Sequence, residues 1–127
     1  MPGLASISID LDGLSHYAAL HGLPAEVVSA EARALVHAVA VPRFAELVEA
    51  VGGRGTLFVI AGEVDRAGRA PLEDALRRGH ELASHSHGHD YALSRAPPEE
   101  IDRDLARAQD VLSSLGVGGP VGFRAPG

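Results

Sequence analysis

Short apolar segments alternate with longer segments of helical periodicity along this chain, and this alternation is the strongest constraint on its fold. Residues 56–61 form a continuous apolar run between glycines, which predicts a strand buried on both faces. Three further strands are predicted over residues 4–9, 81–84 and 121–124. Because helical segments separate these strands, the sequence predicts an α/β fold with a parallel sheet and right-handed crossovers.

Prolines and glycines mark the predicted helices. Apolar residues recur at helical spacing over residues 24–51, where Pro42 predicts a division into two helices. A short helix is predicted over residues 71–78 and a longer one over residues 97–115. The acidic residues of segment 99–104 are interpreted as a solvated helix face.

Length and composition narrow the possible functions. A chain of 127 residues is long enough for one compact domain and no linker divides it, so residues 1–127 are predicted as a single domain. Eleven basic and seventeen acidic residues give a net charge of −6 with no arginine-rich stretch, which argues against binding nucleic acid. Cysteine and lysine are absent, which excludes disulfides, thiolate metal sites and Schiff-base catalysis. Histidine and carboxylate chemistry remain.

Neither a leader nor a membrane-spanning segment can be recognised in the sequence. The first residues lack a charged head followed by a long apolar run, and no window has the length needed to cross a bilayer. We therefore expect no membrane span and a cytoplasmic location, or an extracytoplasmic one if a leader has been removed.

Two carboxylates, Asp10 and Asp12, stand at the end of the first predicted strand. Residues i and i+2 of a strand project from the same face, so both side chains can converge on one ion or one water. Asp12 and Gly13 also form a common turn dipeptide, and a solvated strand end followed by a turn is the structural alternative.

Three histidines stand within five residues after the third predicted strand. His85 and His89 would share one face if this segment is helical, a spacing that holds one metal between two imidazoles. Such a spacing also arises by chance among seven histidines. His87 would point elsewhere and is interpreted, like His80, as a surface or packing residue. His37 lies inside a predicted helix and is interpreted as structural.

Arg124 ends the last predicted strand and is followed by a turn that Pro126 constrains. Taken alone, it is an exposed arginine near a chain end. However, all three groups lie at the carboxyl ends of predicted parallel strands, where α/β proteins gather their active sites. Carboxylates and imidazoles are suitable ligands for a zinc-type ion, and three protein ligands are typical of a catalytic site. Together the groups indicate a metal hydrolase.

Three motifs in order resemble those of the polysaccharide deacetylases, the family with the NodB homology domain, and the resemblance covers nearly the whole chain. Residues 8–12 (SIDLD) resemble the first motif, residues 85–89 (HSHGH) the His-Ser/Thr-x-x-His motif, and residues 124–127 (RAPG) the Arg-x-Pro motif. Segments 55–60 and 79–84 are similar to the family's buried second strand and to the approach to its histidines.

The resemblance implies a parallel-strand (β/α) barrel that is truncated here to about four strands with intervening helices. It implies one divalent metal, most often Zn²⁺, held by Asp12, His85 and His89. A metal-activated water would attack the carbonyl of an N-acetyl group on an amino sugar of a polysaccharide or glycoconjugate. Asp10 is the candidate base and Arg124 the residue that orients it. Pro126 and Gly127 are the candidate contacts to the carbohydrate substrate.

The sequence departs from the family in two ways. Most members place the base directly before the ligand, where this chain has Leu11, so the site resembles the Asp-x-Asp branch. The family's later motifs, including the histidine that protonates the leaving amine, lie beyond residue 127. We therefore expect weak or absent turnover unless His16 or His87 supplies the acid, and self-association through open sheet edges.

Two other functions stay open at this point. A cyclic-amide hydrolase of the allantoinase type would use a similar site on a different substrate. A non-catalytic metal-binding or sugar-binding module is the other alternative, although the chain has no tryptophan and few aromatic residues to stack on sugar rings.

Overall fold

A three-stranded parallel sheet lies at the centre of the computed structural model, which describes residues 3–119 and 122–127. The strand order is β1-β2-β3, and the register places Ile9 opposite Leu57 and Leu57 opposite Leu82. The strands are β1 (Ile7–Asp10), β2 (Gly55–Val59) and β3 (Glu81–Ser84). The predicted α/β class with a parallel sheet is confirmed.

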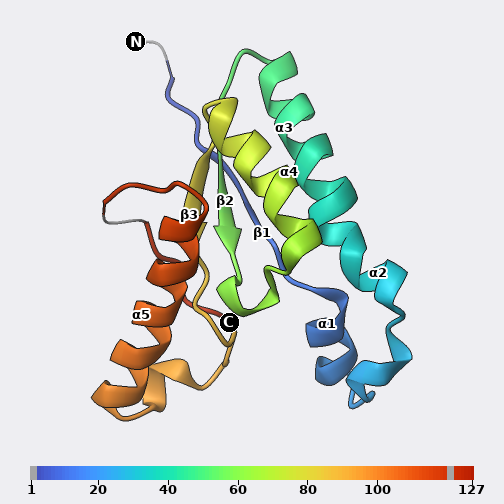
Figure 1. Cartoon of the computed structure of the whole chain (residues 1–127), viewed down its shortest axis with the longest axis vertical. Helices are drawn as coiled ribbons and strands as arrows, with labels where there is room; N and C mark the ends of the chain where they lie inside the picture. Colours follow the sequence, from blue (N-terminus) through green and yellow to red (C-terminus); the bar gives the residue numbers. More distant parts are fainter. Residues whose placement is uncertain (1–2, 120–121) are drawn as a thin grey trace.

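Helices connect the strands and flank the sheet. In Figure 1, α3 and α4 lie together on one flank and α5 lies on the other, next to β3. The helical elements are α1 (Leu14–Leu20), η1 (Ala25–Val27), α2 (Ala30–Leu35), η2 (Val36–Ala40), α3 (Val41–Ala50), η3 (Ala61–Glu63), α4 (Arg66–Arg77), η4 (Leu93–Arg95) and α5 (Pro98–Ser114). Among the described residues, none of the helices is long and apolar enough to span a bilayer.

The hydrophobic core joins strands β2 and β3 to the flanking helices. Leu57 and Val59 of β2 are fully buried, as expected for a strand covered on both faces. They pack with apolar residues from β3 and the three longest helices: Leu82, Val41, Leu72, Ala75 and Leu112. This core holds the strands in place, and it thereby positions the polar side chains that follow their carboxyl ends.

The two helices predicted over residues 24–51 correspond to α2 and α3, and α3 begins next to Pro42, but the break between them is not a loop. The chain instead runs from α2 through a π-helical turn, η2, directly into α3. Proline has no N–H to donate, and its ring clashes with the backbone carbonyl four residues earlier, so it normally kinks a helix. Here the wider π turn precedes the proline, and Pro42 occupies the first turn of α3, where a missing N–H costs little.

Two other helices differ from the sequence prediction. The helix predicted from Pro71 begins five residues earlier, at Arg66, because the Asp65 carboxylate accepts the backbone N–H of Gly68 at 2.7 Å and caps α4. Helix α1 was not predicted, since only Ala18 of its seven residues is buried and its apolar pattern is weak. The prediction of a long helix from near Pro97 is confirmed by α5.

The predicted fourth strand is reduced to a single bridge in the described part of the chain. Val121 lies outside the described residues, and Phe123 pairs with Ser84 in a parallel bridge. The Ser84 N–H donates to the Gly122 carbonyl at 2.8 Å, and the Arg124 N–H donates to the Ser84 carbonyl at 3.0 Å. This bridge extends the order β1-β2-β3 by one position and brings Arg124 to the carboxyl edge of the sheet.

Candidate metal centre

Three side chains that the sequence singled out converge at the carboxyl edge of the sheet. Asp12 follows β1, and His85 and His89 follow β3. Asp12 Oδ1 lies 3.4 Å from His85 Nε2 and 3.4 Å from His89 Nε2, and all three atoms lie within 4.8 Å of one another. Both imidazoles are buried, while the Asp12 side chain remains about one fifth exposed, at 21%.

The geometry of these three atoms fits one divalent cation. Two ligand atoms at about 2.1 Å from a tetrahedral zinc ion are about 3.4 Å apart, which matches the separation of Asp12 Oδ1 from each histidine Nε2. Among the described residues, Asp12 Oδ1 and His89 Nε2 are buried without a hydrogen-bond partner. Buried polar atoms without partners cost free energy, and a shared cation would satisfy both. One carboxylate and two imidazoles are also a donor set that zinc accepts.

The two histidines are oriented by different means. His85 Nδ1 lies 2.8 Å from the backbone carbonyl of Arg124, so Nδ1 carries the proton and Nε2 presents its lone pair. His89 has no such bond among the described residues and is held by aromatic packing. Its ring lies 4.3 Å from the His16 ring and 5.0 Å from the Tyr91 ring, centroid to centroid. Burial lowers the pKa of His89 and so favours the neutral imidazole, although the Asp12 carboxylate acts in the opposite direction.

The histidines meet without the helix that their spacing suggested. Ser86 and His89 adopt φ angles of 65° and 52°, in the left-handed region that non-glycine residues rarely occupy. The Ser86 hydroxyl accepts the His89 N–H at 2.9 Å, which closes a tight turn in place of a helical one. Strained backbone of this kind persists where the surrounding structure holds it, most often at functional sites.

Asp104 anchors this turn, so the interpretation of segment 99–104 as a purely solvated face is wrong at this position. The Asp104 carboxylate accepts the backbone N–H groups of His87 and Gly88 at 2.7 and 2.8 Å. Its role depends on the packing of α5 against β3, which brings a residue fifteen positions beyond His89 back to the turn. The position of Asp104 in the helical repeat is the same as that of a solvent-exposed acidic residue, so the sequence did not indicate this contact.

Asp10 and Arg124 form an ion pair beside the three converging side chains. Arg124 also donates from Nη2 to the Ser8 hydroxyl at 3.0 Å, and its guanidinium carbon lies 3.9 Å above the centre of the Phe58 ring. Asp10 Oδ2 lies 4.0 Å from His85 Nε2. Arg124 therefore holds the carboxylate through its side chain and the His85 ring through its backbone carbonyl.

Glu63 and His16 form a second layer behind His89. His16 Nε2 lies 2.9 Å from Glu63 Oε1, and burial raises the pKa of Glu63 while His16 acts to lower it. A Cβ atom at Gly13 would collide with the Glu63 carboxylate, so glycine at that position permits the close approach. From the sequence, His16 was considered only as a possible acid and Glu63 was not identified, because η3, which carries Glu63, is not adjacent to α1 along the chain.

The remaining predicted residues are not among the three converging ligands. His87 packs against Gly62. His80 is a buried packing residue at the amino-terminal end of β2 and β3, where its Nδ1 accepts the Gly55 N–H at 3.1 Å. Pro126 is buried, and Gly127 lies beside the Tyr91 ring. A role for these last two residues in substrate binding remains a prediction.

Comparisons with known proteins agree with this arrangement. The family model described as polysaccharide deacetylase matches residues 37–127. A crystal structure of a protein from Mycobacterium smegmatis that carries the name polysaccharide deacetylase has 26% sequence identity and a TM-score of 0.76 over 95% of this chain. The Xyl-CE4 domain of a multidomain xylanase from the hindgut metagenome of Trinervitermes trinervoides has 24% identity and a TM-score of 0.62 over 70% of this chain, and this likeness concerns the fold alone. No curated protein sequence matches the chain.

The matched structures are longer than this chain. The chain covers 42% of the Mycobacterium smegmatis protein and 43% of the xylanase chain. The three strands and their helices thus correspond to part of a larger fold in those proteins.

Proposed function

Because the chain belongs to the polysaccharide deacetylase family, we propose that its metal centre removes N-acetyl groups from amino sugars of a polysaccharide or glycoconjugate. The observation that carries this proposal is the convergence of Asp12 Oδ1, His85 Nε2 and His89 Nε2 on one point, two of them buried without hydrogen-bond partners among the described residues. We assign these three residues as ligands of one divalent cation, most often Zn²⁺ in such a donor set. The cation supplies Lewis-acid activation of water and of the amide carbonyl.

Asp10 is proposed as the base that accepts the proton of the attacking water. Its carboxylate lies at the edge of the ligand cluster, and the ion pair with the Arg124 guanidinium fixes its orientation. Arg124 is in turn held by the Ser8 hydroxyl and the Phe58 ring. Each of these contacts supports a carboxylate held in place to accept a proton.

The alternation of side chains along β1 supports Asp10 over the neighbouring position. Leu11 is 1% exposed and belongs to the core, so its side chain points away from the metal ligands. Asp10 and Asp12 project from the opposite face, as residues two apart in an extended segment do. A carboxylate in place of Leu11 would be buried among apolar side chains.

Residues 1–127 are proposed as one domain, the N-terminal part of a polysaccharide deacetylase barrel. The matched Mycobacterium smegmatis protein is more than twice as long, and the general acid is assigned to the part of the barrel outside these residues. We therefore expect the 127-residue chain to release acetate from triacetylchitotriose slowly or not at all in the presence of zinc. Acetate release is the test, with a small cyclic amide as a second substrate. Faster hydrolysis of the cyclic amide would contradict the assignment to amino sugars.

Replacing His16 by alanine is expected to weaken zinc binding by about 10 to 100-fold, the usual effect of losing a residue that supports a metal ligand. His89 has no hydrogen bond that orients its ring among the described residues, so its position depends on packing against His16. Competition titration gives the Kd, and the visible spectrum of the cobalt-substituted protein reports the ligand geometry. His16→Phe keeps an aromatic ring and should restore most of the affinity. An unchanged Kd in His16→Ala would refute this role.

Self-association through open sheet edges is proposed for the 127-residue chain. Strand β1 lies at one end of the strand order, and apolar side chains from Ile9, Leu35, Val39, Phe44 and Leu47 line a hollow beside it. An unpaired strand edge next to apolar surface tends to associate with another chain. Light scattering should show a mass that rises with protein concentration. A monomer at every concentration would contradict the proposal.

A further inference from the structure

Two of the three proposed metal ligands belong to the segment 85–89, here called the ligand turn, which is part of no helix or strand. Its backbone is strained, because Ser86 and His89 have φ angles of 65° and 52°. Strained backbone persists only where surrounding contacts hold it. The contacts that hold the ligand turn therefore decide whether His85 and His89 face the same point.

Three of the five backbone N–H groups of the ligand turn are satisfied by β2, by β3 or by the turn itself. A buried backbone N–H needs a partner, so each of the five bonds can be assigned. The N–H groups of His85, Ser86 and His89 donate to the Val59 carbonyl, the Ser84 hydroxyl and the Ser86 hydroxyl at 2.9, 3.2 and 2.9 Å. Two N–H groups of the turn remain, and neither strand binds them.

These two N–H groups both donate to Asp104, a partly buried residue of α5. Oδ1 accepts the His87 N–H at 2.7 Å and Oδ2 accepts the Gly88 N–H at 2.8 Å. Hydrogen bonds to a carboxylate are shorter and stronger than those between neutral groups. A Cβ atom at Gly88 would lie 3.2 Å from Oδ2, so the carboxylate lies directly against the backbone. Among the described residues, Asp104 is the one side chain outside residues 84–89 that binds these N–H groups.

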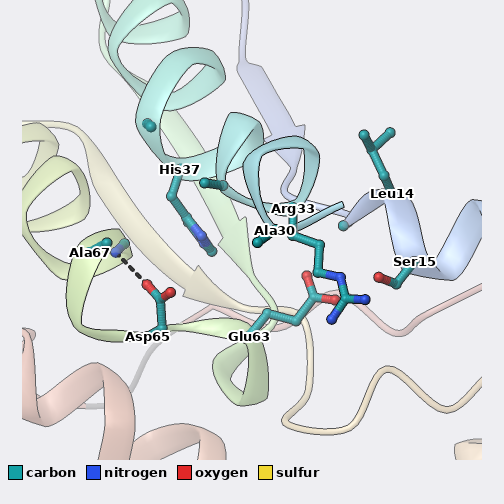
Figure 2. A pocket seen from close by; sticks show the side chains of 12 residues that line it. Leu14, Ser15, Ala30, Arg33, His37, Glu63, Asp65 and Ala67 are labelled. Carbon is teal, nitrogen blue, oxygen red and sulfur yellow. Dashed lines mark hydrogen bonds between the residues drawn. The ribbon is translucent and has the colours of Figure 1, made fainter. Parts of the chain in front are cut away.

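The carbonyl groups of the ligand turn are bound by the backbone of η3. The Gly62 N–H donates to the His87 carbonyl at 3.0 Å, and a Cβ atom at Gly62 would lie only 2.5 Å from that oxygen. The acidic side chains that follow are engaged elsewhere. Figure 2 shows the Asp65 carboxylate bonded at the start of α4 and the Glu63 side chain directed into the cavity that both residues line. Asp104 is therefore the acidic side chain that binds the backbone of the turn.

Helix α5 has apolar anchors of its own. Ala108, one helical turn after Asp104, and Leu112 are both 0% exposed, and Leu112 belongs to the hydrophobic core. Burial of apolar surface is the main force that packs a helix against a sheet. We therefore expect α5 to stay docked when the Asp104 carboxylate is lost, and the effect of that loss to appear in the ligand turn.

We propose that Asp104 is a positioning residue of the metal centre. It acts through the backbone, by fixing residues 87 and 88 between the two histidine ligands. With this pair held, the Nε2 atoms of His85 and His89 both lie 3.4 Å from Asp12 Oδ1 before a cation binds. This role rests on the proposed function, because that function identifies the two histidines as ligands. It adds that the ligand geometry depends on a contact from α5.

Asp104→Asn is the test variant and Asp102→Asn is its matched control. Asparagine keeps the shape of the side chain, but its NH₂ group would face a backbone N–H that needs an acceptor. The zinc Kd should weaken by about 10 to 100-fold, and the visible spectrum of the cobalt-substituted protein should change. Asp102→Asn removes the same charge from an exposed position of α5 and should change neither.

A second measurement uses the metal-free chain. Hydrogen exchange at the His87 and Gly88 amides should be about tenfold faster in Asp104→Asn. The imidazole resonances of His85 and His89 should shift as well, because the two rings, 4.9 Å apart between centroids, lose their fixed separation. The Tm should change little, because the apolar anchors of α5 remain.

A lower Tm with an unchanged zinc Kd and unchanged ring resonances would show that Asp104 only stabilises the fold, and would overturn the inference. An equal loss of zinc affinity in Asp102→Asn would overturn it too, because charge rather than position would then be the cause. Failure of the unsubstituted chain to bind zinc would contradict the proposed function instead. The ring resonances of the metal-free variants would still decide the role of Asp104 in that case.

Discussion

Replacing Asp12, His85 or His89 by alanine is expected to weaken zinc binding by more than about 100-fold, because removing a ligand costs more than disturbing a residue that supports one. Each of the three donor atoms lies within 4.8 Å of the other two, so the loss of any one leaves only two protein ligands for the cation. Competition titration with a chelating indicator measures the Kd of each variant against the unsubstituted chain.

His87→Ala is the matched control for these substitutions. His87 belongs to the same five-residue segment, but its side chain packs against Gly62, and only its backbone N–H contributes to the bond with Asp104. The variant should bind zinc like the unsubstituted chain. If His87→Ala loses zinc as strongly as His85→Ala, the whole segment has been disturbed and the assignment of individual ligands fails.

Replacing Asp10 by asparagine is expected to lower kcat by about 10² to 10⁴-fold, the usual contribution of a positioned general base. Asparagine has nearly the same shape but cannot accept the proton of the attacking water. The zinc Kd should change little, because Asp10 is not among the three converging ligands. Acetate release from triacetylchitotriose is measured in any form of the protein that turns over, with zinc content determined in parallel.

Arg124 provides an internal check on this prediction. Its side chain contacts Asp10, whereas its backbone carbonyl accepts the His85 Nδ1 proton, and a side-chain substitution leaves that carbonyl in place. Arg124→Ala should therefore reduce kcat and spare zinc binding. Unaltered kcat in Asp10→Asn, or loss of zinc from both variants, would show that Asp10 is not the base.

The sequence placed the carboxylates and histidines of the metal centre at one edge of the sheet, because the carboxyl ends of parallel strands meet there. The resemblance to the deacetylase family, rather than strand order, then singled out Asp12, His85 and His89 as the ligands. The helical spacing proposed for His85 and His89 was wrong in its geometry, since a left-handed turn at Ser86 brings the two rings together.

The surroundings of the centre could not be predicted, because they depend on packing between elements distant in the sequence. Asp104 reaches the histidine turn only because α5 packs against β3, and Glu63 meets His16 only because Gly13 leaves room for its carboxylate. The sequence also gave no sign of the π turn that joins α2 to α3 before Pro42.

The stoichiometry of zinc bound to the purified chain tests the central claim most directly. Elemental analysis and titration should give one zinc ion per chain, and no zinc when Asp12, His85 and His89 are replaced together. A chain that binds no zinc, or a triple variant that binds it equally well, would contradict the assignment of this centre.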